Sequence, residues 1–228
     1  MNNCTDFSLL EKELGYSFKN RDLLKQALTH SSYSNEMKIN QYGNYERLEF
    51  LGDAVLELTS SSFFYNSFPE MNEGQLTRLR SSLVCEQALA FCARSIELQK
   101  YIFLGKGEEN TGGRERDSII SDVFEAVLGA IYLDGGYEYA DIFVRKHVLT
   151  DIKNRQLFYD AKTILQEKVQ THGESLSYVV TDETGPDHDK VFKVNAIVGG
   201  KVIGSGEGKS KKAAEQQAAF GVLKNNLY

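Results

Sequence analysis

The 228-residue sequence lacks several features, and each absence excludes a class of protein. No apolar run approaches the ~18 residues of a membrane span, and the acidic N-terminal region has no basic start followed by an apolar core, as a signal peptide would. We therefore expect a cytoplasmic protein with no membrane partner. The three cysteines show neither C-x-x-C nor His-paired spacing, which predicts reduced thiols rather than a disulfide framework or a zinc site.

An excess of positive charge is also missing, because the formal net charge is −6. That value alone argues against a nucleic-acid partner, but the charge is unevenly distributed. Residues 159–228 hold nine lysines and nine acidic residues, so the first 158 residues carry all of the negative charge. Local clustering of cations governs attraction to phosphate more than net charge does.

Acidic residues recur on two apolar stretches, ERLEFLGDAVLEL at 46–58 and SDVFEAVLGAIYL at 121–133. At ~100° per helical residue, Glu46, Glu49 and Asp53 fall within ~60° of one another on the first stretch. Apolar residues, including Phe50 and Ala54, flank this acidic strip. A helix that is apolar nearly all round is expected to be buried.

The second stretch repeats the pattern, with Asp122 and Glu125 three residues apart among apolar neighbours. An ionised carboxylate removed from water costs several kcal/mol unless a partner compensates it. Oxygen ligands alone favour Mg²⁺, or Mn²⁺ in its place, over Zn²⁺. The pattern thus predicts a metal site, with a solvated acidic face on each helix as the alternative. A di-iron bundle is excluded, because no histidine follows a glutamate by three residues.

Helical periodicity dominates the first 150 residues, which predicts an all-α domain over residues 1–152. Further helices are expected at 7–14, 21–28, 73–94 and 137–148. The glycine-rich segment GKGEENTGG at 105–113 is predicted to be a mobile loop, more simply a connector than a substrate clamp.

The chain changes character after residue 152. Residues 153–158 lose clear periodicity and are predicted to form a linker. Residues 159–228 alternate between helical and strand-like patterns in the order α-β-β-β-α, which predicts a small α+β domain. Its helices are expected at 160–171 and 210–227, and its strands at 176–181, 191–198 and 201–207.

The segment GEGKSKKAAEQQAA at 206–219 combines glycines, lysines and the start of a helix. Ser210 is the expected N-cap, and lysines beside the positive end of a helix create an anion site. Gly206 and Gly208 would let the backbone approach a ligand. A nucleoside triphosphate loop is excluded, because position 203 is Ile where that motif needs Gly. We expect binding to a phosphate backbone through Lys209, Ser210, Lys211 and Lys212, with solvated lysines as the alternative.

Double-stranded RNA is recognised by shape, through minor-groove 2′-hydroxyls and the phosphates across the intervening groove. The small domain has three surfaces suited to such recognition, which are the lysine-rich helix start, the turn that carries His188, and the first helix. The first helix would present polar side chains to sugars and base edges, namely Thr163, Gln166, Glu167 and Gln170. His188 by itself would only be a solvated turn residue.

Two further polar residues have competing interpretations. Glu73 stands at a helix start, where it either interacts favourably with the helix dipole or joins a catalytic site. His30, in ALTHSS, is expected to cap a helix end or to satisfy a buried carbonyl, and no catalytic triad can be built around it.

The motifs together resemble bacterial ribonuclease III, an endonuclease specific for double-stranded RNA. The resemblance is carried by ERLEFLGDAVL at 46–56, DVFEAVLGAIYLDGG at 122–136 and GEGKSKKAAEQQAA at 206–219. FKNRDLLKQALTHSSY near the start and KTILQEKVQ in the small domain extend it over almost the whole chain. One departure is Tyr45, where relatives commonly have Asn; it puts no catalytic role in doubt.

The resemblance implies a dimeric helical nuclease domain, a flexible linker and a double-stranded-RNA-binding domain. It assigns metal-ligand positions to Glu49, Asp53, Asp122 and Glu125, and further catalytic positions to Glu46 and Glu73. It implies hydrolysis assisted by two Mg²⁺ ions, with 5′-phosphate and 3′-hydroxyl products. A two-fold dimer would cut both strands with a stagger, in the processing of ribosomal RNA precursors and other structured transcripts.

Two other functions compete with this one. A non-cleaving RNA-binding regulator would keep the helical domain for dimerisation alone and would have lost some of the six acids, all of which are present. A phosphohydrolase acting on small esters would leave the small domain without a role.

Overall fold

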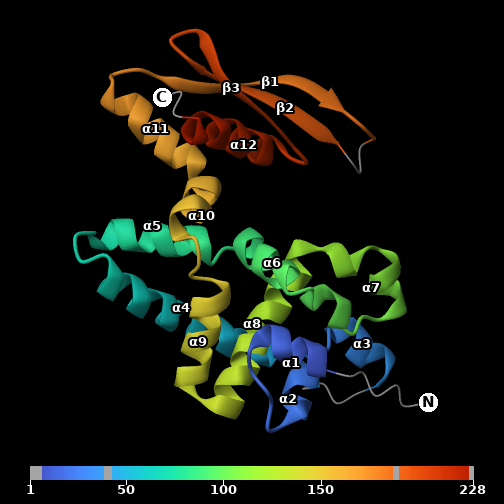
Figure 1. Ribbon diagram of the computed structural model, residues 1–228. Coiled ribbons are helices and arrows are strands. Elements are labelled where there is room, and N and C mark those ends of the chain that lie inside the picture. The colour runs from blue at the N-terminus through green and yellow to red at the C-terminus, as the bar shows by residue number, and fades with distance from the viewer. Residues whose placement is uncertain (1–6, 39–42, 187–189, 226–228) are drawn as a thin grey trace. The chain divides into compact units, whose positions relative to one another are not determined.

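The computed structural model describes residues 7–38, 43–186 and 190–225 (Figure 1). Contacts divide the chain into two compact units, Met1–Thr150 and Asp151–Tyr228. Across the described ranges, no helix combines the length and the apolar character needed to cross a membrane.

The first unit is helical, as predicted. No strand forms among its described residues, and the single isolated bridge joins Thr29 to Phe103. Its α-helices are α1 (Ser8–Leu14), α2 (Arg21–Ala27), α3 (Ser31–Glu36), α4 (Glu46–Ser67), α5 (Glu73–Leu83), α6 (Glu86–Ser95), α7 (Lys106–Asn110), α8 (Asp117–Gly135) and α9 (Tyr137–His147). Two 3₁₀ turns accompany them, η1 (Leu98–Tyr101) and η2 (Gly113–Glu115).

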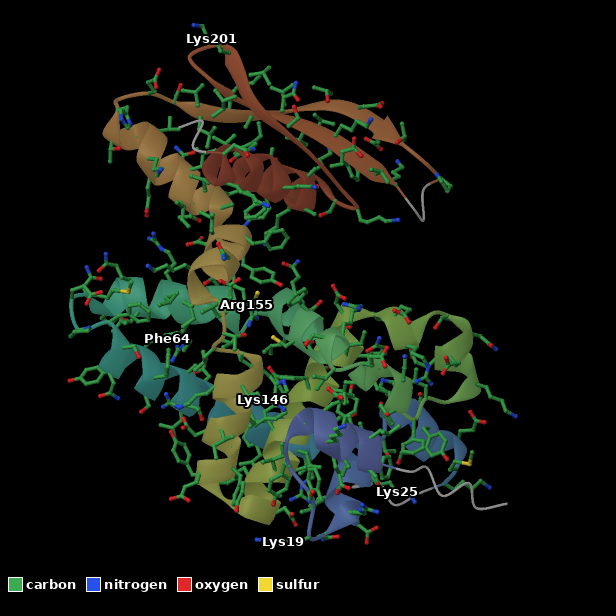
Figure 2. All side chains as sticks on the ribbon, in the orientation of Figure 1. Lys19, Lys25, Phe64, Lys146, Arg155 and Lys201 are labelled. Carbon is green, nitrogen blue, oxygen red and sulfur yellow. The ribbon has the colours of Figure 1, made fainter. Side chains whose placement is uncertain are left out.

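Helix α8 forms the centre of this unit. Most of its residues are buried, from Ile119 to Ile131, and it packs against α2, α4, α6 and α9. On the α9 side, the Phe124 and Phe143 rings lie 5.1 Å apart. Side chains such as Phe64 fill the interior, whereas lysines such as Lys19 lie on the surface (Figure 2).

Helices α4 and α8 cross in main-chain contact, because each has a glycine at the crossing. A Cβ atom on Gly52 would lie 1.8 Å from the Glu125 carbonyl oxygen, and one on Gly129 would lie 2.2 Å from the Leu48 carbonyl oxygen. Any larger residue would push the helices apart. The close crossing brings Glu49 on α4 next to the acidic turn of α8.

Two predicted features of this unit are wrong. The expected helix at 73–94 breaks, because Cys85 adopts extended backbone (φ −73°, ψ 158°) at the N-cap position of α6. The segment at 105–113, which was predicted to be a loop, instead contains α7 and the start of η2. Arg114 fixes this segment through two nitrogens on the Glu109 carboxylate, at 2.8 and 2.5 Å, and through a third contact to the Ile102 carbonyl.

The second unit has α-β-β-β-α topology, as predicted, preceded by one additional helix. Its elements are α10 (Ile152–Tyr159), α11 (Ala161–Thr171), β1 (Leu176–Thr184), β2 (Val191–Val198), β3 (Lys201–Gly208) and α12 (Lys211–Lys224). The strands form an antiparallel sheet in the order β1-β2-β3. Its core joins Leu165 and Val169 of α11, Val198 of β2, and Val222 of α12.

The predicted linker at 153–158 instead folds as α10, which packs on this unit. The Phe158 ring meets the Phe220 ring of α12 edge-on, with centroids 5.1 Å apart. Gln216 donates to the Phe158 carbonyl at 2.6 Å and accepts from the Lys162 backbone N–H at 3.2 Å. Tertiary contacts thus stabilise a helix that the weak periodicity did not indicate.

The role predicted for two glycines is also corrected. Gly206 and Gly208 were expected to let the backbone approach a ligand. A Cβ on Gly206 would lie 2.3 Å from the Ala218 nitrogen, and one on Gly208 would lie 2.6 Å from the Ala214 nitrogen. These glycines therefore let β3 pack closely against α12.

Candidate functional site

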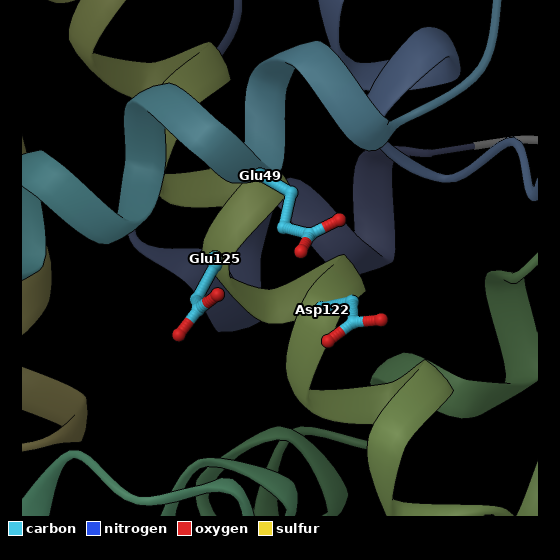
Figure 3. A group of neighbouring side chains, drawn as sticks. All are labelled: Glu49, Asp122 and Glu125. Carbon is cyan, nitrogen blue, oxygen red and sulfur yellow. The ribbon is translucent and has the colours of Figure 1, made fainter.

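Three carboxylates from α4 and α8 converge at the helix crossing (Figure 3). Glu49, Asp122 and Glu125 each offer one oxygen, and these oxygens all lie within 4.8 Å of one another. We call these residues the acidic cluster. The i, i+3 spacing on α8 and the glycine crossing with α4 place them together, and all three side chains are partly buried.

The electrostatics of the acidic cluster are unfavourable without a cation. Burial raises the pKa of Glu125 to about 8, and the charges of Asp53, Asp122 and Glu49 add to the rise. Burial likewise raises the pKa of Glu49 to about 7, assisted by its acidic neighbours. The pKa of Asp122 also rises through burial, and a hydrogen bond from Tyr45 opposes this rise.

The cluster fits a hard divalent cation. All its donors are carboxylate oxygens, a set that suits Mg²⁺ or Mn²⁺. Burial and neighbouring carboxylates raise the pKa of Glu49 and Glu125, so without a cation these two carboxyls keep their protons to higher pH than ordinary glutamates do. Cation binding would remove the repulsion and release protons.

Asp53 and Glu46 border this cluster on α4, but both are exposed. The charge of Asp53 raises the pKa of Glu125 and Glu49, and the charge of Glu46 raises that of Glu49. Both carboxylates therefore act electrostatically on the cluster, although neither belongs to the group of three converging oxygens.

The prediction that α4 is buried nearly all round is wrong. One face of α4 packs on the interior, but Phe50 is 81% exposed, Leu58 59% and Tyr65 74%. Together with the exposed Ala54, these residues fall within ~80° around the helix, and we call them the α4 apolar stripe. Two depressions, with volumes of about 630 and 590 Å³, are lined in part by residues of the stripe.

Glu73 lies at the start of α5, away from the acidic cluster. Asn72 and Gln75 form a capping box there, and the Thr77 hydroxyl donates to Glu73 at 3.2 Å. Glu73 lines the larger depression beside the α4 apolar stripe, with Leu58 and Tyr65. Within this chain, it does not join the three converging carboxylates.

Tyr45 is a site neighbour to which the sequence assigned no role. Its side chain is buried, and its hydroxyl donates to Asp122 Oδ2 at 3.3 Å. His30 caps α3 as expected, since its Nδ1 accepts from the Ser32 backbone N–H at 3.1 Å, and its ring packs against the Tyr45 ring. These two residues are far from Asp122 in sequence, so only the fold brings them together.

The second unit presents the predicted polar and basic residues on its surface. Thr163, Glu167 and Gln170 are exposed on α11, and Gln166 is partly exposed beside them. Ser210 caps α12 as predicted, because its hydroxyl accepts from the Ala213 backbone N–H at 3.2 Å.

Exposed lysines surround this helix start: Lys209, Lys211 and Lys212, which we call the basic cluster. Lys211 Nζ also lies 5.9 Å from the centre of the Phe192 ring. The antiparallel sheet agrees with the exclusion of a nucleoside triphosphate loop. His188 lies outside the described residues.

Comparisons with known proteins match both units. A ribonuclease-III-like family model matches residues 20–152, and a double-stranded RNA binding motif matches residues 161–226. Ribonuclease 3 of Pelotomaculum thermopropionicum is 50% identical over 93% of this chain and 90% of its own length. Ribonuclease 3 of Listeria monocytogenes is 46% identical over 92% of this chain and 93% of its own length.

A solved structure agrees with these matches. It is the nuclease domain of ribonuclease III from Campylobacter jejuni, which is described for structural flexibility in a region involved in dimer formation. It is 41% identical, with a TM-score of 0.57, and the match covers 62% of this chain and 98% of that one.

Proposed function

The chain belongs to the ribonuclease III family of endoribonucleases specific for double-stranded RNA, and we propose that it cleaves by metal-assisted phosphodiester hydrolysis at the acidic cluster. The convergence of Glu49, Asp122 and Glu125 at the crossing of two helices is the observation that carries the proposal. Asp53 is the fourth proposed ligand, because its charge acts on two of these residues. Glu46 and Glu73 are proposed as further acidic residues of the cleavage site.

We propose Mg²⁺ as the ion and Mn²⁺ as a substitute. When bound, two such ions supply an activated water and stabilise the leaving oxygen of an in-line displacement. The protein's part is to hold four carboxylates at a fixed separation and to release their protons on loading. The water oxygen would bond to phosphorus and lose a proton while the bond between phosphorus and the 3′ oxygen breaks, and the 3′ oxygen would take up a proton, which leaves 5′-phosphate and 3′-hydroxyl ends.

The second unit is proposed to hold the RNA. The basic cluster would neutralise phosphates, and the exposed residues of α11 would reach the minor groove: Thr163, Gln166, Glu167 and Gln170. His188, in the segment Gly185-Pro186-Asp187-His188 that the sequence predicts to be a turn, is proposed as a contact to a minor groove. Because phosphate contacts release counterions, affinity should fall as salt rises.

A second copy of the chain is the proposed occupant of the α4 apolar stripe. A two-fold pair is self-complementary, so one exposed stripe would meet its symmetry mate. Three residues of this stripe are large, apolar and exposed, namely Phe50, Leu58 and Tyr65, and Phe50 directly follows Glu49 of the acidic cluster. Two sites in one dimer would cut both strands with a stagger, in ribosomal RNA precursors and other structured transcripts.

The test is cleavage of a blunt RNA duplex with and without Mg²⁺, alongside RNA binding measured by gel shift in Ca²⁺. Glu125→Gln should abolish cleavage and leave RNA binding nearly intact, because it removes a ligand charge from the first unit only. A variant that cuts within tenfold of wild type would refute the assignment of Glu125. A matched control is Glu70→Gln, which changes an exposed residue elsewhere in the first unit.

A further inference from the structure

Tyr45 makes the one side-chain hydrogen bond that reaches the acidic cluster from the described residues. Its hydroxyl lies 3.3 Å from Asp122 Oδ2, and its side chain is 5% exposed. Glu49 and Glu125 have no such donor among the described side chains. Asp122 is thus distinguished from its two partners by a fixed neutral donor.

Two contacts hold Tyr45 in place, one from its backbone and one from its ring. The Tyr45 backbone N–H donates to the Thr29 carbonyl at 2.9 Å. The Tyr45 and His30 rings pack with centroids 5.6 Å apart, and the Ser32 backbone N–H fixes the His30 ring. A tyrosine phenol is protonated at neutral pH, so the Tyr45 hydroxyl is a donor to the carboxylate.

We propose that Tyr45 is a positioning residue, which holds one oxygen of Asp122 by hydrogen bonding and leaves the other oxygen free to bind the metal. This inference rests on the proposed function, because it requires Asp122 to be a ligand. Carboxylate ligands are commonly oriented by an outer hydrogen bond, and loss of that bond costs about 10–100-fold in metal affinity or activity. Donation to one oxygen restricts rotation of the carboxylate before the ion arrives.

The experiment measures Mn²⁺ binding to the full chain without RNA, from the loss of the free Mn²⁺ resonance in electron paramagnetic resonance spectra. Tyr45→Phe removes only the hydroxyl and should weaken Mn²⁺ binding about 10-fold. Tyr16→Phe is the matched control, because Tyr16 is also buried and its hydroxyl donates to a carboxylate oxygen, Asp134 Oδ2, over 2.7 Å. Asp134 is not part of the acidic cluster. This control should lower thermal stability without changing Mn²⁺ affinity.

Two further measurements separate positioning from a merely structural role. In a double-mutant cycle with Asp122→Asn, the Tyr45→Phe change should have little further effect on Mn²⁺ binding. Cleavage by the Tyr45→Phe variant should recover substantially at high Mg²⁺. A variant that was inactive because its structure was lost would not recover when Mg²⁺ is added. If the variant does not fold, 3-fluorotyrosine placed at position 45 of the otherwise wild-type chain should show a Mg²⁺-dependent ¹⁹F shift that position 16 lacks.

The outcomes are distinguishable. If the wild-type chain binds no Mn²⁺ without RNA and shows no Mg²⁺-dependent cleavage, the proposed metal site fails and the role of Tyr45 fails with it. If wild type binds Mn²⁺ and Tyr45→Phe binds within twofold of it, the metal site stands and the positioning role is overturned. A ¹⁹F spectrum unchanged at saturating Mg²⁺ would also overturn it.

Discussion

Removal of the Glu125 charge should stabilise the first unit in the absence of metal, although the same change should stop cleavage. Burial and three neighbouring carboxylates raise the pKa of Glu125 from an ordinary 4.5 to about 8. The folded chain therefore holds this proton more tightly than the unfolded chain does. By linkage, wild-type stability falls as pH rises from about 4.5 to about 8. The Glu125→Gln variant has no carboxyl proton to lose at this position, so its stability should not fall for this reason as pH rises.

The magnitude follows from the pKa difference. Each pKa unit corresponds to about 1.4 kcal/mol, so the full rise sets an upper limit of about 5 kcal/mol above pH 8. The side chain is only partly buried, and its neighbours can move apart, so we expect about 2 kcal/mol for Glu125→Gln at pH 8.5. Near pH 4.5 both side chains are neutral, and the difference should nearly vanish.

The assay is thermal unfolding in EDTA at pH 4.5 and pH 8.5, followed by calorimetry so that the transitions of the two units can be separated. For a unit of this size, 2 kcal/mol corresponds to roughly 4–8 °C in Tm. Millimolar Mg²⁺ should then stabilise wild type more than the variant, because only wild type keeps the full set of proposed ligands. An equal or lower Tm for Glu125→Gln at pH 8.5 in EDTA would show that the carboxylate is solvated. Glu70→Gln should leave Tm unchanged at both pH values.

Three other changes test the crossing, the basic cluster and the stripe. Gly52→Ala should lower the free energy of unfolding by about 2 kcal/mol or more and remove most of the cleavage activity, because the new Cβ would lie 1.8 Å from the Glu125 carbonyl oxygen. Gly74→Ala is the control, because its Cβ would make only an ordinary contact. Equal cleavage activity in the two variants would contradict the reasoning. Glutamine at all three positions of the basic cluster should lower duplex affinity and reduce the slope of log affinity against log salt by about 2–3, read by gel shift; an unchanged slope would rule out phosphate contacts there. Phe50→Asp should shift sedimentation from dimer to monomer and leave the Tm of the first unit nearly unchanged, whereas a monomeric wild type would refute the dimer.

Helical periodicity predicted an acidic face on each of the two helices, but the predicted ligand set also included Asp53, which does not join the three converging oxygens. Asp122 and Glu125 are three residues apart on α8, so a helix places them on one face, and Glu49 lies on the acidic face of α4. The apolar neighbours of these residues indicate that both faces are close to the interior. The sequence could not show that Phe50 faces outward. An apolar side chain has the same pattern whether it packs inside its own chain or against another molecule.

Other features were missed because they depend on contacts between distant segments. Tyr45 and Asp122 are 77 residues apart in sequence, so their hydrogen bond has no local pattern. The α10 helix has weak amphipathic spacing, and it is stabilised by the contact of Phe158 with Phe220 of α12. The break at Cys85 arises from one extended residue within an otherwise continuous helical period.

The main-chain contact between α4 and α8 has a consequence for how this nuclease can change over evolution. At the crossing, Gly52 and Gly129 let backbone atoms meet directly, so no side chain acts as a spacer between the helices. The separation of the acids on the two helices is therefore independent of the size of core residues farther along them, such as Phe64 or Phe124. Substitutions in the interior can alter stability while the geometry of the acidic cluster is kept, and the tolerance to substitution should end abruptly at the two glycines.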